Sequence, residues 1–182
     1  MKNKLGIIFF VCAVIAILVI FKYVNTNSLN PEKSAQTQQQ TPTKESLTQF
    51  MKNNTWTDYA SSEIKIKPEF FDSAKTTYIH LWASWCAPCV NEVPELISFA
   101  QKSSDQVKFI TISLDDDINE LSKFLISFPD FNSDRFIKIF DKDKKMAQFI
   151  NADRLPMTIK VSGDELKEIR SVVDWKSIAV EK

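Results

Sequence analysis

Apolar and polar positions alternate in regular periods along the C-terminal part of this chain, and they predict the order of its elements. Continuous apolar runs predict strands buried on both faces over residues 77–82 and 107–114. Between them, apolar residues at helical spacing predict a helix over residues 88–103. A capping pattern that starts at Asp117 predicts a second helix, which ends near Phe128. The order up to this point is β-α-β-α.

Shorter periodic segments fill the rest of the domain. The predicted strands cover residues 63–66, 136–140, 157–161 and 166–172, and short helical segments cover residues 68–71, 145–150 and 175–180. Ser162 to Glu165 form a tight turn between the last two strands. The whole order predicts an α/β fold with a central mixed sheet, parallel in its first half and antiparallel at the hairpin, with helices on both faces.

An unbroken apolar run, residues 5–21, stands near the start of the sequence. Its length reaches the lower limit for a membrane-spanning helix, and the lysines before it place the N-terminus inside the cell. The competing interpretation is a cleaved signal peptide, which requires a small-x-small site that does not follow this run. We therefore expect residues 1–24 to be a signal anchor of a single-pass protein in the cytoplasmic membrane, with its C-terminal domain outside the cytoplasm.

Residues 25–48 are rich in Asn, Thr, Gln, Ser and Pro and have few apolar residues to bury, so they predict a flexible linker. Residues 49–182 then form one domain, long enough to bury roughly two thirds of its unfolded surface. The formal net charge is zero and the chain has only two glycines. These features argue against a nucleic-acid partner and against a glycine-rich phosphate loop.

Two of the three cysteines fall inside the domain, as Cys86-Ala87-Pro88-Cys89. They follow a predicted strand and open a predicted helix, where free N–H groups and the helix dipole stabilise a thiolate on Cys86. Cys89 lies about one turn further on and can attack a mixed disulfide made by Cys86. The alternative is half of a zinc site, but zinc requires four ligands and only His80 would add a third. We therefore expect a redox-active pair, no metal and no cofactor.

The sequence resembles the thioredoxin fold, and specifically the membrane-anchored thiol–disulfide oxidoreductases of the TlpA/ResA/CcmG type. The resemblance spans roughly residues 60–175. It rests on Trp82-Ala83-Ser84-Trp85-Cys86-Ala87-Pro88-Cys89, on Glu92, Pro94 and Leu96 after it, and on the later segments Thr111–Asp115 and Leu155–Thr158. A signal anchor with an outward domain also suits this family.

The resemblance implies roles for residues outside the cysteine pair. Glu92 corresponds to an acid that helps to manage the protons of the cysteines, and the alternative is an ordinary exposed glutamate. Pro156 corresponds to a cis-proline that faces the active site, and the alternative is a trans turn proline. Leu155 and Met157 beside it are then expected to face the substrate. Residues at the motif itself are expected to border the substrate as well; these are Trp85, Ala87 and Pro88.

His80 departs from the family pattern. It lies six residues before Cys86, where thioredoxins have a buried Asp and TlpA-like proteins commonly have an Asn. A buried imidazole at this position can relay a proton to Cys89 or, if charged, lower a thiol pKa. The alternative is a hydrogen-bonded core histidine with no part in the chemistry.

These observations predict an extracytoplasmic, membrane-tethered enzyme, periplasmic or on the outer surface, that reduces disulfides in exported proteins. The reduced pair is then regenerated by a transmembrane thiol-reductant donor, because the compartment is oxidising. The resemblance implies work such as preparing apocytochrome c thiols for haem attachment. Two alternatives stay open, a disulfide oxidase or isomerase and a copper-binding or copper-delivery module. Copper modules usually bring a histidine from a later loop, and no histidine follows Cys89.

Overall fold

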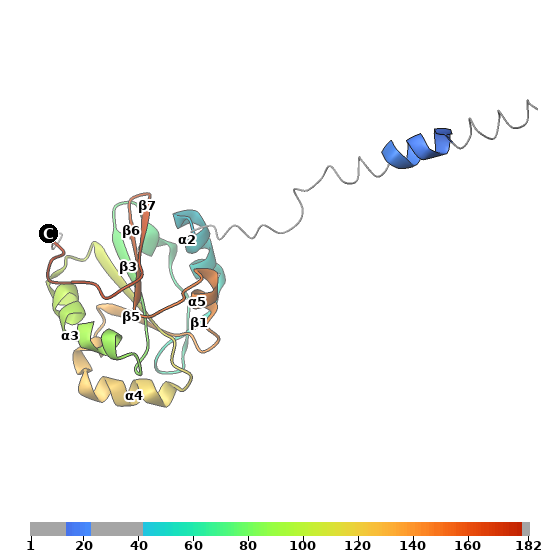
Figure 1. The fold of residues 1–182 in the computed structure, drawn as a ribbon. Helices are drawn as coiled ribbons and strands as arrows, with labels where there is room; N and C mark the ends of the chain where they lie inside the picture. The colour runs from blue at the N-terminus through green and yellow to red at the C-terminus, as the bar shows by residue number, and fades with distance from the viewer. Residues whose placement is uncertain (1–13, 23–41, 180–182) are drawn as a thin grey trace, which may run out of the picture. The chain divides into compact units, whose positions relative to one another are not determined.

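The computed structural model describes residues 14–22 and 42–179 of the 182-residue chain, which divides into two units, residues 1–40 and 41–182. In the first unit, residues 14–22 are helical, with exposed side chains (Figure 1). Over the described ranges, no helix is both long enough and apolar enough to span a bilayer. The rest of the predicted anchor and most of the predicted linker lie outside the described residues.

Seven strands of the second unit form one mixed sheet, in the order β2-β1-β5-β4-β3-β6-β7. The strands are β1 (Trp56–Thr57), β2 (Glu63–Ile64), β3 (Thr76–Trp82), β4 (Val107–Ser113), β5 (Phe136–Phe140), β6 (Met157–Ser162) and β7 (Glu165–Ile169). β3, β4 and β5 are parallel, whereas β6 is antiparallel to β3 and β7 is antiparallel to β6. The predicted mixed sheet and its antiparallel hairpin are confirmed, but its first half is not wholly parallel, because β1 is antiparallel to β5 and β2 is antiparallel to β1.

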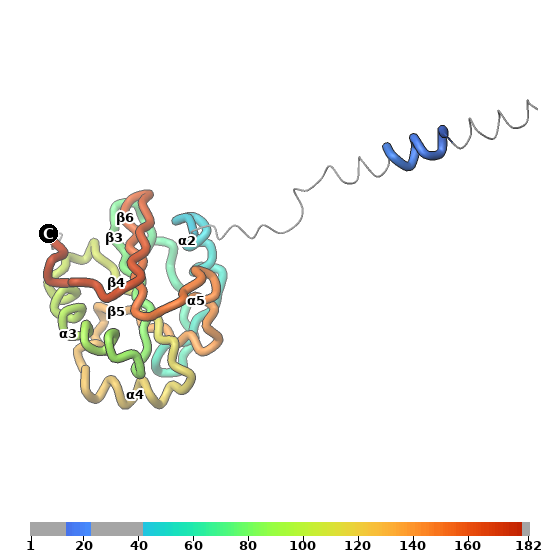
Figure 2. The backbone as a smooth tube through the Cα atoms, in the orientation of Figure 1, coloured from blue at the N-terminus to red at the C-terminus, as the bar shows by residue number. Residues whose placement is uncertain are grey.

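Helices cover both faces of this sheet. They are α2 (Lys44–Asn53), α3 (Ala87–Lys102), α4 (Ile118–Ser127) and α5 (Lys145–Phe149), with the 3-10 turns η2 (Pro68–Phe71) and η3 (Pro129–Asn132). Buried residues of α3 and α4 share one core cluster, and those of α2 and α5 share the other. The tube in Figure 2 likewise places α3 on one side of the strands and α2 and α5 on the other.

Central strand β3 is buried along its whole length because both faces of the sheet are covered. Its side chains alternate between the two clusters: Tyr78 and Trp82 belong to the cluster of α3, whereas Ile79 and Leu81 belong to the cluster of α2 and α5. His80 stands between Tyr78 and Trp82 in this alternation. The alternation therefore places the imidazole on the same face as the cysteine-bearing helix.

The predicted boundary between linker and domain is wrong by several residues. Helix α2 begins at Lys44, inside the segment predicted as linker, and a capping box between Thr43 and Ser46 starts it. Leu47 and Met51 are fully buried in the core. The physical reason is that two apolar residues at a spacing of i, i+4 are enough to dock a short helix, although the surrounding composition is polar.

The predicted C-terminal helix over residues 175–180 is also wrong where the structure describes it, since residues 175–177 form only turns. Instead, the tail runs across α3 and buries Val173 and Trp175 in the core cluster of that helix. The tail therefore covers this face of the sheet without regular structure.

Candidate active site

Cys86 and Cys89 form a disulfide at the N-terminus of α3, with an Sγ–Sγ distance of 2.02 Å. Cys86 is the N-cap residue of the helix, and the N–H of Cys89 donates to Cys86 Sγ at 3.3 Å. Cys86 keeps 6% of its surface exposed, whereas Cys89 is fully buried. On reduction, the same N–H groups stabilise a thiolate on Cys86, so the sulfur that meets the solvent is also the more nucleophilic one.

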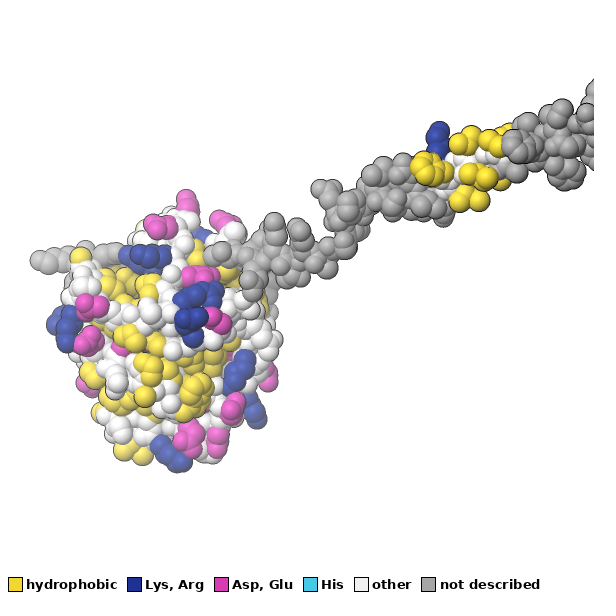
Figure 3. All heavy atoms as spheres, viewed as in Figure 1, with side chains coloured by type: hydrophobic (Ala, Val, Ile, Leu, Met, Phe, Trp, Pro, Cys, Tyr) yellow, Lys and Arg dark blue, Asp and Glu magenta, His cyan; other side chains and the backbone are white. Residues whose placement is uncertain are grey.

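A groove of about 770 Å³ lies beside Cys86. Four of the five residues predicted to face the substrate line it: Trp85, Ala87, Pro88 and Leu155. Trp85 is 67% exposed, and charged residues that include Arg154 also line the groove. Figure 3 shows one face of the domain, where hydrophobic side chains gather between charged groups.

Met157 is the exception, and its predicted role at the substrate is wrong for this structure. Its side chain is fully buried in the cluster of α2 and α5. The reason is the strand period of two: Met157 is the first residue of β6 and pairs with Leu81, so both turn toward the same core. Leu155 stands before the strand and is free of that alternation.

The Leu155–Pro156 peptide bond is cis, as the family pattern implies. Pro156 is buried at the start of β6, next to the residue that lines the groove. This arrangement brings a loop from late in the sequence to the groove that Cys86 lines.

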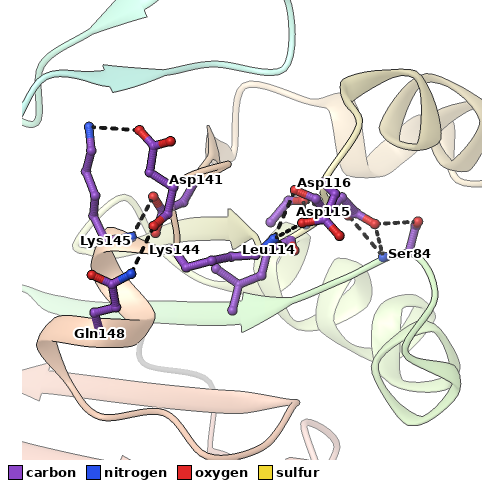
Figure 4. A network of polar contacts seen from close by, with 10 residues as sticks. Ser84, Leu114, Asp115, Asp116, Asp141, Lys144, Lys145 and Gln148 are labelled. Carbon is purple, nitrogen blue, oxygen red and sulfur yellow. Dashed lines mark hydrogen bonds and ion pairs between the residues drawn. The ribbon is translucent and has the colours of Figure 1, made fainter.

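Asp115 holds the loop that precedes the cysteines, a role that the sequence reasoning missed. Its buried carboxylate accepts from the Ser84 N–H at 3.1 Å and from the Ser84 hydroxyl at 2.7 Å (Figure 4). The Ser113 hydroxyl donates to the same carboxylate at 2.6 Å. The available signal was an aspartate that directly follows a buried strand adjacent to the strand of the cysteines.

Lys144 braces the same region from the N-terminus of α5. Its ammonium group donates to the Leu114 and Asp115 carbonyl oxygens and to the Asp116 carboxylate (Figure 4). The neighbouring Asp141 carboxylate caps α5 by accepting from the Lys145 N–H at 3.0 Å. These contacts tie the ends of β4 and β5 together beneath the groove.

Glu92 lies one turn after Cys89 on α3 and is buried, which excludes the alternative of an ordinary exposed glutamate. Its Oε2 accepts from the Val173 N–H at 2.9 Å, and its Oε1 lies 3.3 Å from His80 Nε2. Burial raises the pKa of Glu92 to about 7. A carboxyl with this pKa can exchange protons near neutral pH.

His80 is buried as well, and its Nδ1 lies 3.0 Å from Thr158 Oγ1 on β6. Burial lowers the pKa of His80 to about 3, so the imidazole is neutral at physiological pH. The Trp175 ring packs against it, with ring centroids 6.1 Å apart. The structure thus brings His80 and Glu92 together and seals them with the C-terminal tail, which the sequence reasoning did not foresee.

A metal site would require several ligands in one place. Within residues 14–22 and 42–179, no group of three or more His, Cys, Asp and Glu side chains is arranged to hold a metal ion. The imidazole nitrogens of His80 face Thr158 and Glu92.

The strand–CxxC–helix unit and the cis-proline loop match a known family. Residues 72–165, more than half of the chain, match the family model described as thioredoxin-like. The chain belongs to the thioredoxin-like family. This thioredoxin-like chain is 31% identical over 65 residues to thioredoxin 1 of Synechococcus elongatus, a match that covers 36% of the chain and 61% of the relative.

Two further similarities are to proteins named as thiol-disulfide or disulfide oxidoreductases. The chain is 41% identical over 44 residues to sporulation thiol-disulfide oxidoreductase A of Bacillus subtilis, which covers 24% of the chain and 27% of that relative. These matches span less than two thirds of the curated relatives. A secreted Mycobacterium tuberculosis disulfide oxidoreductase homologous to E. coli DsbE shares the fold, with a TM-score of 0.59 and 17% identity over 70% of this chain and 92% of the other. The resemblance to the thioredoxin fold seen in the sequence is confirmed.

Proposed function

We propose that this thioredoxin-like chain is an extracytoplasmic, membrane-tethered thiol–disulfide oxidoreductase that reduces disulfides in exported proteins. The observation that carries the proposal is the Cys86–Cys89 disulfide, whose first sulfur opens on the groove while the second is buried. The apolar run over residues 5–21 and the secreted relative support a site of action outside the cytoplasm.

The chemistry follows from the two positions. The Cys86 thiolate attacks a substrate disulfide, one substrate sulfur leaves as a thiolate, and a mixed disulfide forms. The Cys89 thiolate then attacks Cys86 Sγ, which releases the second substrate sulfur and leaves the Cys86–Cys89 disulfide. Two electrons pass to the substrate in each cycle. A transmembrane thiol-reductant donor returns two electrons to the pair.

Glu92 takes part in this cycle as the group that exchanges a proton with Cys89. The support is its burial one turn from Cys89 and its raised pKa. Leu155, held before the cis peptide bond, presents its backbone to an extended substrate segment, while Trp85, Ala87 and Pro88 form the apolar wall. Apocytochrome c thiols are a substrate class that fits a reductase of this kind.

The reduction potential of the pair tests the direction of the reaction. We would use the full-length chain in detergent, with Cys12→Ser so that only one cysteine pair remains, and equilibrate it against defined glutathione or dithiothreitol ratios. A potential near that of thioredoxin, about −270 mV, supports a reductase. A potential near about −120 mV would show a disulfide-forming enzyme instead.

A further inference from the structure

A buried acid and a buried imidazole face each other behind the cysteine pair, and the exchange of disulfides as written above uses only the acid. Glu92 reaches the site from α3 and His80 from β3, and their facing atoms, Oε1 and Nε2, lie 3.3 Å apart. Both atoms are buried, and neither makes a hydrogen bond of good geometry with any described group. A buried polar atom without a hydrogen bond costs free energy, so we expect a proton to lie between these two atoms.

Each remaining polar atom of the two side chains has one defined partner. The Val173 N–H donates to Glu92 Oε2, and His80 Nδ1 lies 3.0 Å from the Thr158 hydroxyl. A neutral imidazole has one donor nitrogen and one acceptor nitrogen, whereas a threonine hydroxyl can donate or accept. Thr158 can therefore satisfy Nδ1 whether or not this nitrogen carries the proton.

The charged groups nearest to His80 and Glu92 do not neutralise the Glu92 carboxylate. From α3 come the buried Cys89 and the partly exposed Glu95, which pairs with Lys176 of the tail at 2.5 Å. From β6, Lys160 lies over the Tyr78 ring at 5.7 Å. The buried Trp175 indole N–H opposes part of the effect of burial on the pKa of Glu92. Among these described groups, no cation touches the Glu92 carboxyl.

We propose that His80 and Glu92 hold one shared proton site, which takes up the proton of Cys89 when the mixed disulfide is resolved, and that the imidazole changes tautomer as it does so. The inference rests on the function proposed above. His80 acts through Glu92 and is therefore a positioning residue.

Two states satisfy every hydrogen bond. In the deprotonated state, Nε2–H donates to the Glu92 carboxylate and the Thr158 hydroxyl donates to Nδ1. In the protonated state, the Glu92 O–H donates to Nε2 and Nδ1–H donates to Thr158. The imidazole is neutral in both, in keeping with its burial.

The step balances in atoms and electrons. The Cys89 S–H gives its proton to the Glu92 carboxylate, and the resulting thiolate attacks Cys86 Sγ. The bond between Cys86 and the substrate sulfur breaks, its electron pair leaves with that sulfur, and the Cys86–Cys89 bond forms. The substrate thiolate then takes a proton from water. The pair ends in the protonated state: Nε2 releases its proton to water and Nδ1 takes one up from water, so the ring keeps one proton and ends in its Nδ1–H form.

The composition of the chain offers a direct test, because His80 is its single histidine. We would label the full chain with ¹⁵N-histidine, without a histidine tag, and follow the two ring nitrogens by NMR in detergent from about pH 5 to pH 9. We expect a neutral ring throughout, Nδ1–H at low pH and Nε2–H at high pH, with a midpoint near 7, where Glu92 titrates. A single tautomer over the whole range, or an imidazolium at mildly acidic pH, would overturn the inference.

Two matched variants test whether the tautomer change of His80 depends on Glu92. In Glu92→Gln the tautomer should no longer depend on pH, because the acid is gone. In Glu95→Gln, one turn further along the same helix, the switch should stay. A switch that persists in Glu92→Gln would contradict the shared proton site.

The resolving step provides a second readout. With the Cys12→Ser chain and Ellman's reagent, release of thionitrobenzoate from Cys86 reports the attack by Cys89. In His80→Asn, the side-chain amide N–H can donate to Glu92 but cannot transfer its proton, so it favours the carboxylate over the protonated carboxyl. We expect the midpoint of the pH–rate profile to fall by about one unit and the plateau rate to fall on the order of tenfold. An unchanged profile overturns only this inference, whereas a wild-type chain that forms no mixed disulfide would overturn the proposed function itself.

Discussion

The two ends of one CxxC motif lie in opposite surroundings. Cys86 opens on a groove with a largely exposed tryptophan beside it, whereas Cys89 points into a sealed region with Glu92, His80 and the fully buried part of the tail behind it. The N-terminus of α3 therefore separates nucleophilic attack from proton handling over a single helical turn. In the mechanism proposed above, the open side recognises the substrate and the closed side sets the pH dependence.

The largest effect is expected when the open side loses its sulfur. Cys86→Ser should lower the rate of disulfide exchange by at least about 10³-fold, because no thiolate remains to start the reaction. Cys89→Ser should instead trap the mixed disulfide, which mass spectrometry of the non-reduced protein detects. If both variants lost activity and neither trapped an adduct, the proposed order, in which Cys86 attacks the substrate and Cys89 resolves the mixed disulfide, would be wrong.

The second expected effect is a difference in folding stability between a tryptophan of the closed side, Trp175, and one of the open side, Trp85. Trp175→Ala should destabilise the domain by about 3–5 kcal/mol, because it removes a buried ring that packs on Tyr78, His80 and Phe99. Trp85→Ala should cost less than about 0.5 kcal/mol, because that residue is 67% exposed. Urea unfolding of both oxidised variants, followed by circular dichroism, measures the difference. Equal losses in the two variants would contradict the contrast between an open and a closed side.

The smallest effect concerns the pH dependence of stability. The pKa of Glu92 is raised from 4.5 to about 7 in the folded state, so the folded chain binds this proton more tightly than the unfolded chain does. Relative to Glu92→Gln, the wild-type chain should be most stable below pH 4.5 and should lose about 1–3 kcal/mol as the pH rises to about 7. Urea midpoints of both proteins across this range test the sign. A gain in relative stability with rising pH would show that the Glu92 carboxylate is stabilised in the fold.

Much of the fold was predictable because its signals are local. The buried runs that became β3 and β4 are continuous, and the bounds of β5 match the prediction, since these strands lie in the covered centre of the sheet. Helix α2 was missed because Leu47 and Met51 are embedded in polar sequence, and only their docking on the core makes the helix stable. Strand β1 has only two residues, too few to show an alternation of apolar and polar positions in the sequence.

The residues of the candidate active site also divide into those that the sequence predicted and those that it did not. Cys86 and Cys89 follow from a motif and its spacing, whereas the resemblance to a known family pointed to Glu92 and to the cis bond before Pro156. Asp115 and Met157 did not follow, because their roles depend on which way a side chain turns at the end of a strand.

The sequence by itself determined the family and the reacting sulfurs of this protein, because a CxxC that opens a helix carries its chemistry in consecutive residues. Only the tertiary structure decided the partner of His80. Glu92, Thr158 and Trp175 come from α3, β6 and the tail, and they meet His80 only when the sheet and its covering segments are packed. A pKa depends on burial and on neighbours distant in sequence, and neither exists before the chain folds.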